Sequence, residues 1–438
     1  FCLIAFVVFV AFDADGTSDE VRQTSAGPEL STVEVTPEPA ASDSSAPVRG
    51  VDAGSDSVVD ATDDSPTSLP TTSSLPTTST TMPTAGLQQT SDSQPIASTA
   101  PPRSTTTTRS AGTAKPAAAS PVYGFSPGGW FPDESDSELY ADLDRMAEVG
   151  ATWLRLDFDW SEIEGNEGTY HWHRTDRVVD AARDRGLEVL GLITESPKWA
   201  RPAGASSYSP PIDPADYARF AAAVAERYGQ RGVTTFELWN EPNVAIFWGP
   251  TPNPELYADL VKPAAAAMRA KRNDLTILSG GLAPAADEPD GSALSPMTFT
   301  RRMIEAGAAE VFDGFAIHPY SYPARPIDPA SAAWNPFHNL PRFHDLLADA
   351  GHGHKPIWLT EYGAPTGTSS RAVSEVEQAA QIIEAMEVAA DWSWTGPILL
   401  YAHRDNATNP ADLESNFGLL RHDGTPKQAW RDLMARRG

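Results

Sequence analysis

Two glutamates lie directly after short apolar segments and could act together in acid–base chemistry. Glu241 stands in the run WNEPN at 239–243, and Glu361 stands in TEYG at 360–363. Two carboxyl groups in different surroundings can cleave an acetal, because one donates a proton to the leaving oxygen while the other, ionised, faces the oxocarbenium-like carbon. A glutamate in such a place can also be a helix N-cap or a surface acid. The matched positions of the two favour catalysis.

Four further polar side chains lie close to the ends of apolar segments. They are Asn240, Arg155, His318 and Tyr320. Arg155 could be a structural residue that pairs with Asp157 or Glu195. His318 could also be a hydrogen-bonded core histidine. The sequence offers it no second and third ligand at metal spacing, so we expect no metal site and no cofactor.

Carboxylates at strand ends need a scaffold that brings those ends together. From residue 121 onward, eight short apolar segments alternate with eight amphipathic segments of helical spacing. This alternation predicts an α/β fold of the (β/α)8 TIM-barrel type, in which reactive groups follow the carboxyl ends of the strands. A doubly wound sheet is the alternative, but GFSPGG at 124–129 lacks the G-x-G-x-x-G spacing of its phosphate loop.

The elements of this barrel can be placed along the chain. The predicted strands are 122–125, 152–160, 187–193, 234–239, 275–278, 314–317, 356–359 and 397–401. The predicted helices are 135–149, 176–185, 254–270, 299–306, 340–350, 374–390 and 426–436, with one more that begins at the Asp213-Pro214 cap. Pro263 predicts a kink or a restart inside the helix at 254–270.

The sequence resembles the clan A glycoside hydrolases, which are retaining enzymes with catalytic glutamates after the fourth and seventh strands. The resemblance covers essentially all of residues 121–438 and is greatest to family 39 and to family 5-like members of the cellulase superfamily. The matching runs are WNEP at 239–242, TEYG at 360–363, LRL at 154–156, IHPY at 317–320, FGLL at 417–420 and DGTPK at 423–427.

The resemblance implies a role for each matching residue. Glu241 would be the general acid/base and Glu361 the nucleophile that forms a covalent glycosyl-enzyme. Asn240 would hydrogen-bond the 2-hydroxyl of the cleaved sugar, and Arg155 would pair with Glu361. The implied separation of the two carboxyl groups is about 5–5.5 Å, which predicts retention of anomeric configuration.

Other residues would shape the cleft around this pair. The resemblance implies that His318 and Tyr320 organise the nucleophile side and the region of the ring oxygen. Sugar clefts use aromatic faces, and five tryptophans lie at or beyond expected strand ends. They are Trp160, Trp199, Trp239, Trp248 and Trp334. Trp199 and Trp248, in the loops after the third and fourth strands, are the preferred stacking residues, with ordinary packing as the alternative.

The sequence departs from the clan after the eighth strand, where many members carry a tryptophan beneath the cleaved sugar. The run LYAHRD at 400–405 has none, so His403 or Arg404 could accept a carboxylated or otherwise substituted sugar. Family 39-like enzymes often add a β-sandwich, whereas this chain ends with the eighth expected helix. We therefore favour endo-cleavage of an extracellular or cell-wall polysaccharide.

Two other functions are compatible with the same fold. One is a carbohydrate-binding protein that has lost turnover, although a binder has no need for an intact set of Glu241, Glu361, Asn240 and Arg155. The other is a transglycosylase, which passes the sugar from the same covalent intermediate to another acceptor. Acceptor competition distinguishes the transglycosylase from a hydrolase.

Charge and cysteine content exclude several classes of partner. The 438 residues include 59 acidic and 32 basic side chains, for a formal net charge of −27. An anionic protein repels phosphate backbones, so we expect no nucleic-acid partner. The single cysteine, Cys2, excludes a disulfide framework within the chain and a Cys-ligated zinc or Fe–S centre. Nothing in the sequence indicates an oligomer.

The N-terminal part has a different composition from the rest. Residues 1–12 are an unbroken apolar run that suits a truncated export signal or a signal anchor. Residues 13–120 are rich in Ser, Thr, Pro and Ala, and have too few apolar side chains to offset an ordering entropy of about 1–2 kcal/mol per residue. We expect a disordered linker that carries O-glycans or is an unmodified spacer, and that tethers a catalytic domain at 121–438 to a membrane or cell wall. The predicted location is extracellular or at the cell surface.

Overall fold

The computed structural model describes residues 121–437, and in this part of the chain eight strands alternate with helices. The strands are β1 (Tyr123–Phe125), β2 (Trp153–Asp159), β3 (Glu188–Thr194), β4 (Thr235–Asn240), β5 (Thr276–Gly281), β6 (Phe315–Ile317), β7 (Ile357–Tyr362) and β8 (Thr395–Leu400). The helices are α1 (Asp136–Val149), α2 (Trp160–Ile163), α3 (His173–Asp184), α4 (Pro214–Gly229), α5 (Pro254–Lys271), α6 (Pro296–Glu305), α7 (Leu340–Asp349), α8 (Glu375–Asp391) and α9 (Gln428–Arg437).

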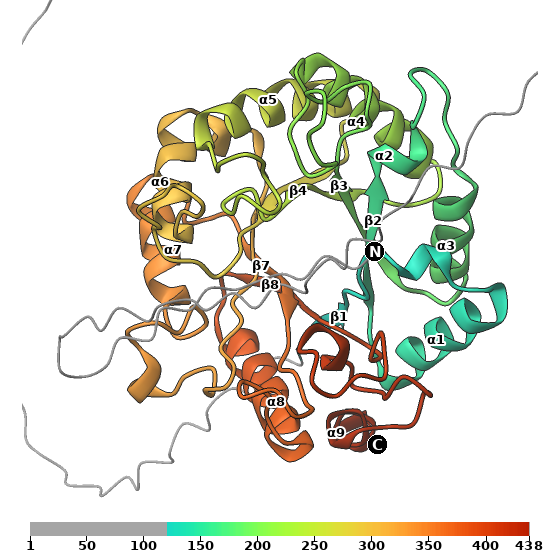
Figure 1. Ribbon diagram of the computed structural model, residues 1–438, viewed down its shortest axis with the longest axis vertical. Helices are drawn as coiled ribbons and strands as arrows, with labels where there is room; N and C mark the ends of the chain where they lie inside the picture. Colours follow the sequence, from blue (N-terminus) through green and yellow to red (C-terminus); the bar gives the residue numbers. More distant parts are fainter. Residues whose placement is uncertain (1–120, 438) are drawn as a thin grey trace, which may run out of the picture. The chain divides into compact units, whose positions relative to one another are not determined.

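The strands form one parallel sheet that closes into a barrel. Neighbours pair in the order β5-β4-β3-β2-β1-β8-β7-β6, and isolated parallel bridges Leu278–Gly314 and Leu282–Ile317 connect the β5 and β6 ends of the sheet. The helices surround the barrel, and α1, α3, α4, α5, α6, α7, α8 and α9 follow one another counterclockwise in Figure 1, while the short α2 lies between α3 and α4 in this view. The predicted (β/α)8 fold is confirmed.

Local capping sets the helix boundaries and explains most of the agreement with the sequence prediction. Ser135 and Glu138 form a reciprocal capping box at the start of α1, and Gly150 ends the helix with φ 99°. At the start of α2, which the sequence did not predict, the side chain of Asp159 caps the amide of Glu162.

Three predicted helices differ from the structure by three residues or in continuity. Helix α3 begins at His173 rather than at residue 176, and helix α6 begins at Pro296 rather than at residue 299. Helix α5 continues through Pro263 without the predicted restart. Buried residues on both sides of this proline, Leu260 and Ala264, pack into the core. Their burial outweighs the one backbone hydrogen bond that Pro263 cannot make.

The barrel interior changes from apolar to polar along the strands. A buried apolar cluster fills part of the barrel, formed by Leu190, Leu278, Ala316, Trp358 and Leu399 with Trp153 packed against it. Two residues beyond Trp153 and Trp358, the same strand faces carry Arg155 and Thr360, which both hydrogen-bond Glu237. The apolar layer thus supports a polar layer directly below the barrel mouth.

Several sequence predictions concern residues outside the described range. The export signal or anchor at 1–12 and the linker at 13–120 both lie outside residues 121–437. Within 121–437, none of the helices combines the length and the hydrophobicity that crossing a membrane requires.

Candidate active site

Glu241 reaches the barrel mouth because the backbone leaves the regular strand conformation at the end of β4. Trp239 (φ 77°) and Glu241 (φ 44°) both adopt the left-handed region, which is rare for residues with a β-carbon. Trp239 packs into the core, and its Nε1 donates to the carbonyl oxygen of Phe247 at 2.7 Å. Asn240 and Glu241 then both border the central cleft. Local backbone strain of this kind is common at functional sites.

Glu361 lies near the end of β7, where the register with β8 shifts between Leu359 and Tyr362. Nη1 of Arg155 donates to Oε1 of Glu361 at 2.7 Å, and the hydroxyl of Tyr320 donates to Oε2 at 2.8 Å. Each carboxylate oxygen therefore has its own donor, and the orientation of the carboxylate is fixed.

Arg155 is the centre of a buried network that connects β2, β4 and β7. Its Nε and Nη2 donate to the two carboxylate oxygens of Glu237 at 2.8 and 3.1 Å, and Nη2 also donates to Oδ1 of Asn240 at 2.9 Å. Glu237 is fully buried, and it accepts a further hydrogen bond from the amide of Gly281 at 2.8 Å. Arg155 bonds Glu361, as the resemblance implied, and the sequence analysis missed its second carboxylate partner, Glu237.

His318 follows β6 and bridges the two glutamates. Its Nδ1 lies 2.7 Å from Oε1 of Glu241 and 3.6 Å from Oε2 of Glu361. The fully buried ring fits only because residue 281 is glycine, since a β-carbon there would lie 2.2 Å from Nε2 of His318. The imidazole thus belongs to the site and is not a remote core histidine.

The two glutamates lie close enough to act on one atom. A carboxylate oxygen of Glu241, one of Glu361 and a ring nitrogen of His318 all lie within 4.8 Å of one another. Retaining glycosidases separate their carboxyl groups by about 5–5.5 Å, whereas inverting enzymes need about 6.5–9.5 Å to admit a water molecule. The short separation matches the retaining geometry.

The surroundings shift the pKa values of Glu241 and Glu361 in opposite directions. Burial raises the pKa of Glu241, and the hydrogen bond from His318 offsets only part of this effect. Burial also acts to raise the pKa of Glu361, but the nearby charges of His318 and Arg155 outweigh it and hold that pKa below its usual value. The hydrogen bonds from Tyr320 and Arg155 add to this lowering.

The pKa of His318, which lies between the two glutamates, is also shifted. Burial acts to lower the pKa of His318, but the two neighbouring glutamates outweigh it, and the pKa lies above the usual value. A protonated imidazole here stabilises an ionised Glu361.

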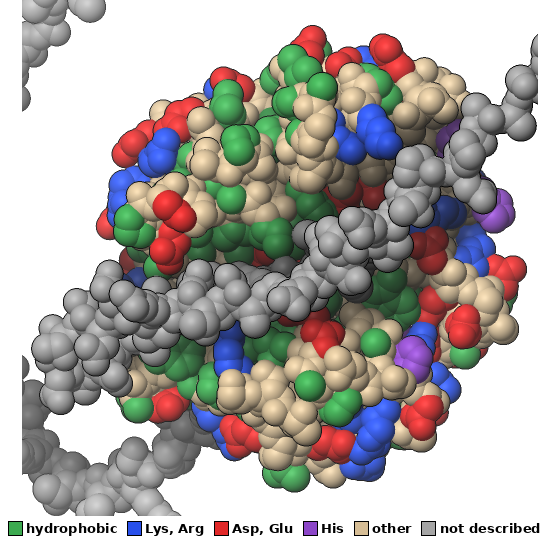
Figure 2. Space-filling model, in the orientation of Figure 1, with side chains coloured by type: hydrophobic (Ala, Val, Ile, Leu, Met, Phe, Trp, Pro, Cys, Tyr) green, Lys and Arg blue, Asp and Glu red, His purple; other side chains and the backbone are tan. Residues whose placement is uncertain are grey.

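These side chains line a cleft of about 570 Å³. Its described lining includes six carboxyl groups, which are those of Asp157, Glu195, Glu241, Glu361, Asp412 and Glu414. Arg155 is the one Lys or Arg among the described lining residues, and its charge is matched by Glu237 and Glu361. Burial raises the pKa of Asp157 to about 6, and burial raises those of Glu195 and Glu414 to about 8. Figure 2 shows this face hollowed at its centre, with acidic side chains among those that border the hollow.

The preferred stacking residues were wrong. Trp248 is buried, with 1% of its surface exposed, and its ring packs edge-on against Trp239 and Tyr257. Trp199 does not line the cleft, and its Nε1 donates to the carbonyl oxygen of Glu164 at 2.8 Å. The aromatic residues that do line the cleft are Trp130, Tyr208, Phe247, Tyr320, Tyr322, Tyr401 and Phe417. Tyr401 directly follows β8, where many clan members carry a tryptophan.

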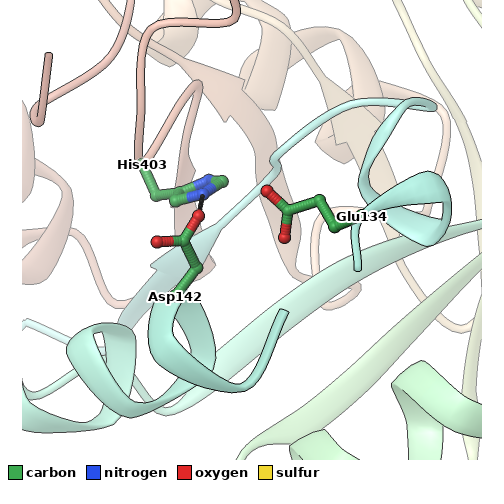
Figure 3. A group of neighbouring side chains, drawn as sticks. All are labelled: Glu134, Asp142 and His403. Carbon is green, nitrogen blue, oxygen red and sulfur yellow. Dashed lines mark hydrogen bonds and ion pairs between the residues drawn. The ribbon is translucent and has the colours of Figure 1, made fainter. Parts of the chain in front are cut away.

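The suggestion that His403 or Arg404 accepts a carboxylated sugar was also wrong. His403 is fully buried, and its Nε2 lies 2.8 Å from Oδ2 of Asp142, which belongs to α1 (Figure 3). Arg404 donates to the same oxygen at 2.8 Å and also bonds Oε1 of Glu134. Both side chains already have carboxylate partners away from the cleft lining, because the chain after β8 turns back toward α1.

Two clusters of described residues have donor atoms close enough to hold a metal ion. One is Glu241, His318 and Glu361, and the other is Glu134, Asp142 and His403. In each cluster an arginine already bonds a carboxylate, Arg155 in the first and Arg404 in the second. A positive guanidinium in contact with the donors disfavours a second cation, so neither cluster supports the assignment of a metal centre.

Comparison with known proteins agrees with the fold and the motifs. The sequence model of the Cellulase family (glycosyl hydrolase family 5) matches residues 112–396. No curated protein matches the sequence. Among solved structures, the chain is similar to a family 39 glycoside hydrolase from the gut symbiont Bacteroides cellulosilyticus WH2, with 22% identity and a TM-score of 0.56. That match covers 72% of this chain but only 62% of the other, so this chain spans less than two thirds of that protein.

A second similar structure is a GH5_18 protein from Streptomyces cattleya in complex with Manb1-4GlcNAc. It has 18% identity and a TM-score of 0.56, over 73% of this chain and 80% of that chain. At such identities, structural likeness shows the (β/α)8 fold alone. The family match is more specific, because it spans well over half of the chain. The chain therefore belongs to glycosyl hydrolase family 5.

Proposed function

We propose that this protein is a glycosidase that works with retention of configuration, with Glu361 as nucleophile and Glu241 as general acid/base. The observation that carries the proposal is the pair of carboxylate oxygens within 4.8 Å of each other, on groups whose pKa values are shifted apart. A lowered pKa keeps Glu361 ionised for attack, and a raised pKa keeps a proton on Glu241.

The reaction takes two balanced steps. Ionised Glu361 attacks the anomeric carbon while Glu241 gives its proton to the leaving oxygen, so the C–O bond breaks and a glycosyl ester of Glu361 forms. Water then attacks the same carbon, Glu241 takes back a proton, and the ester bond to Glu361 breaks. Arg155 and Tyr320 hold the nucleophile from both sides through bonds of 2.7 and 2.8 Å.

Asn240 is placed to bind the sugar during this reaction. Its Oδ1 accepts a hydrogen bond from Arg155 at 2.9 Å, so the orientation of the side-chain amide is set by a cation. Its NH2 group then remains as the donor for the 2-hydroxyl of the cleaved sugar. Such a contact strengthens in the transition state and contributes to rate as well as to binding.

The cleft favours uncharged or cationic sugars over uronic acids. Its described lining has one arginine, which is already paired with carboxylates, so a carboxylated sugar would find no unpaired Lys or Arg among these residues. A volume of about 570 Å³ is typical of sites that hold drug-sized ligands, which are larger than one sugar ring. Together with the composition of residues 1–120, this supports an exported enzyme that cuts within an extracellular or cell-wall polysaccharide and is tethered through its N-terminus.

The test is detection of the covalent intermediate. The full chain is incubated with a panel of 2-deoxy-2-fluoro aryl glycosides that differ in the sugar, and intact mass is measured before and after proteolysis. We expect one adduct, located on Glu361, which also identifies the sugar. The Glu361→Ala variant should form none, whereas Glu414→Gln, a control in the same cleft, should still form it.

Further outcomes distinguish the alternatives. Glu241→Ala should spare aryl glycosides with good leaving groups more than natural linkages, because good leaving groups need little protonation. Equal losses on both would contradict the acid role of Glu241. No adduct with folded protein and any panel member would leave two readings, an endo-enzyme that needs an oligosaccharide to fill its cleft or a carbohydrate-binding protein without turnover. Products extended by an added acceptor sugar would instead indicate a transglycosylase.

A further inference from the structure

We propose that Trp130 is the platform on which a substrate sugar stacks, and that a buried cluster behind it, formed by Glu134, Asp142, His403 and Arg404, holds the indole ring in position. The proposal rests on the proposed function and adds one binding residue and four positioning residues to it.

A short series of contacts connects Trp130 to the nucleophile. Trp130 lines the cleft, and a β-carbon on Gly128 would lie 3.4 Å from its Nε1 and 3.7 Å from the ring of Tyr401. The two rings therefore approach each other across a glycine. Tyr401 contacts the ring of Tyr320 edge-on with centroids 6.4 Å apart, and Tyr320 bonds Glu361. A sugar on Trp130 would thus lie in the same cleft as the bond that is cleaved.

His403 and Arg404 pack against the indole ring of Trp130, which also borders the cleft. The His403 ring stacks on Trp130 with centroids 5.7 Å apart and planes 25° apart, and Cζ of Arg404 lies 5.3 Å from the indole centroid. Both side chains bond the same oxygen, Oδ2 of Asp142, at 2.8 Å. The two groups therefore lie close to each other beside the ring. Together they support Trp130.

The supporting cluster is itself held rigidly. Asp142 is 2% exposed and accepts a further hydrogen bond from Arg145 at 3.0 Å, in addition to those from His403 and Arg404. Glu134 approaches the other end of the Arg404 guanidinium, and Figure 3 shows its carboxyl group facing the pair of Asp142 and His403. Buried ion pairs contribute little net stability, so a cluster of this kind directly behind a cleft aromatic is better explained by positioning.

The first experiment measures the platform itself. Steady-state kinetics and calorimetric binding use the full chain, with the aryl glycoside that it cleaves fastest and the β-linked di- and trisaccharides of the same sugar. Trp130→Ala should raise KM and Kd about tenfold and change kcat less than about threefold, whereas Trp130→Phe should stay close to the parent protein. An unchanged KM and Kd in Trp130→Ala would overturn the proposal.

A matched control separates the platform from general damage to the fold. Trp199 also lies under an arginine, with Cζ of Arg219 5.6 Å from its ring centroid, but it does not line the cleft. Trp199→Ala should leave KM and Kd unchanged. If the parent protein cleaves and binds none of the glycosides, the proposed function fails. If the parent cleaves them and both tryptophan variants behave alike, only the platform assignment fails.

The second experiment tests positioning by a double-mutant cycle. Arg404→Gln and Asp142→Asn should each raise KM several-fold at nearly constant kcat, and neither should raise it further when Trp130→Ala is already present. If the increases in KM of the single variants multiply in the double variant, the cluster does not act through Trp130. Because Asp142→Asn removes a buried charge and could prevent folding, Arg404→Gln, at a side chain that is 11% exposed, keeps the test decisive.

Discussion

Glu241 and Glu361 are the same residue type, and their neighbours alone give them different acidities. Glu361 faces a guanidinium, an imidazole and a phenol hydroxyl, all of which stabilise its ionised form. Glu241 has the imidazole of His318 as its hydrogen-bond partner and is otherwise affected mainly by burial, which favours the protonated form. The assignment of nucleophile and acid therefore follows from the position of Arg155, which bonds only one of the two glutamates.

This difference predicts a bell-shaped dependence of kcat/KM on pH. Activity should be lost as pH falls through the lowered pKa of Glu361, when the nucleophile gains a proton, and as pH rises through the raised pKa of Glu241, when the acid loses its proton. Tyr320→Phe removes a donor that lowers the pKa of Glu361, so the acid limb should move to higher pH while the basic limb stays in place. A pH series with an activated aryl glycoside measures both limbs, and movement of the basic limb alone would contradict the assignment.

Strands β4, β5, β6 and β7 each supply one part of the site at the carboxyl end. The end of β5 contributes no side chain to the site. Gly281 matters because it leaves free the volume that the His318 ring occupies. The amide of Gly281 also donates to Glu237 at 2.8 Å. The strand end thus sets both the height of the imidazole and the position of the buried carboxylate under Arg155.

Gly281→Ala should consequently reduce activity far more than stability. The added β-carbon would lie 2.2 Å from Nε2 of His318 and would push the ring away from Glu241, so kcat should fall by about 10²-fold. The melting temperature and kcat of the variant are compared with those of Gly165→Ala, a glycine in an exposed loop whose substitution should change neither. A folded Gly281→Ala enzyme with parental kcat would show that His318 is not needed at this position.

Acidic side chains gathered in one cleft affect the stability of the whole molecule. Burial raises the pKa of both Glu195 and Glu414 from 4.5 to about 8 and raises that of Asp157 from 3.8 to about 6. The folded state therefore binds more protons than the unfolded state between these values, and the free energy of unfolding must fall as pH rises through this window. The carboxyl groups that border the substrate site act against the fold at neutral pH.

The melting temperature should accordingly be higher near pH 5 than near pH 8. Scanning calorimetry of the full chain across this range measures the slope. The double variant Glu195→Gln, Glu414→Gln carries no titrating group at these positions and should show a flatter slope and a higher melting temperature at pH 8. An equal slope in both proteins would mean that these two groups ionise normally in the folded state.

The extent to which the sequence predicted the molecule depended on how local each signal was. The strand and helix alternation is a local pattern, and so are the two glutamates that directly follow strands, so the fold and the candidate pair were found. Glu237 also left a local signal, a charged residue inside an apolar strand, which requires a buried cation. Trp248 and Trp130 could not be distinguished in this way, because both lie in loops and only tertiary packing determines which ring is buried.

The guanidinium of Arg155 joins the carboxylate of Glu361, the carboxylate of Glu237 and the amide of Asn240 in one rigid unit. An enzyme built in this way can change its substrate only by a particular evolutionary route. Any substitution within the unit disturbs nucleophile orientation and hydroxyl recognition at once, so a beneficial first step there is rare. The loops after β3 and β8, which carry Glu195 and Glu414, can vary one residue at a time. Selection for a new glycan should therefore accumulate its changes in those loops and leave the strand ends intact.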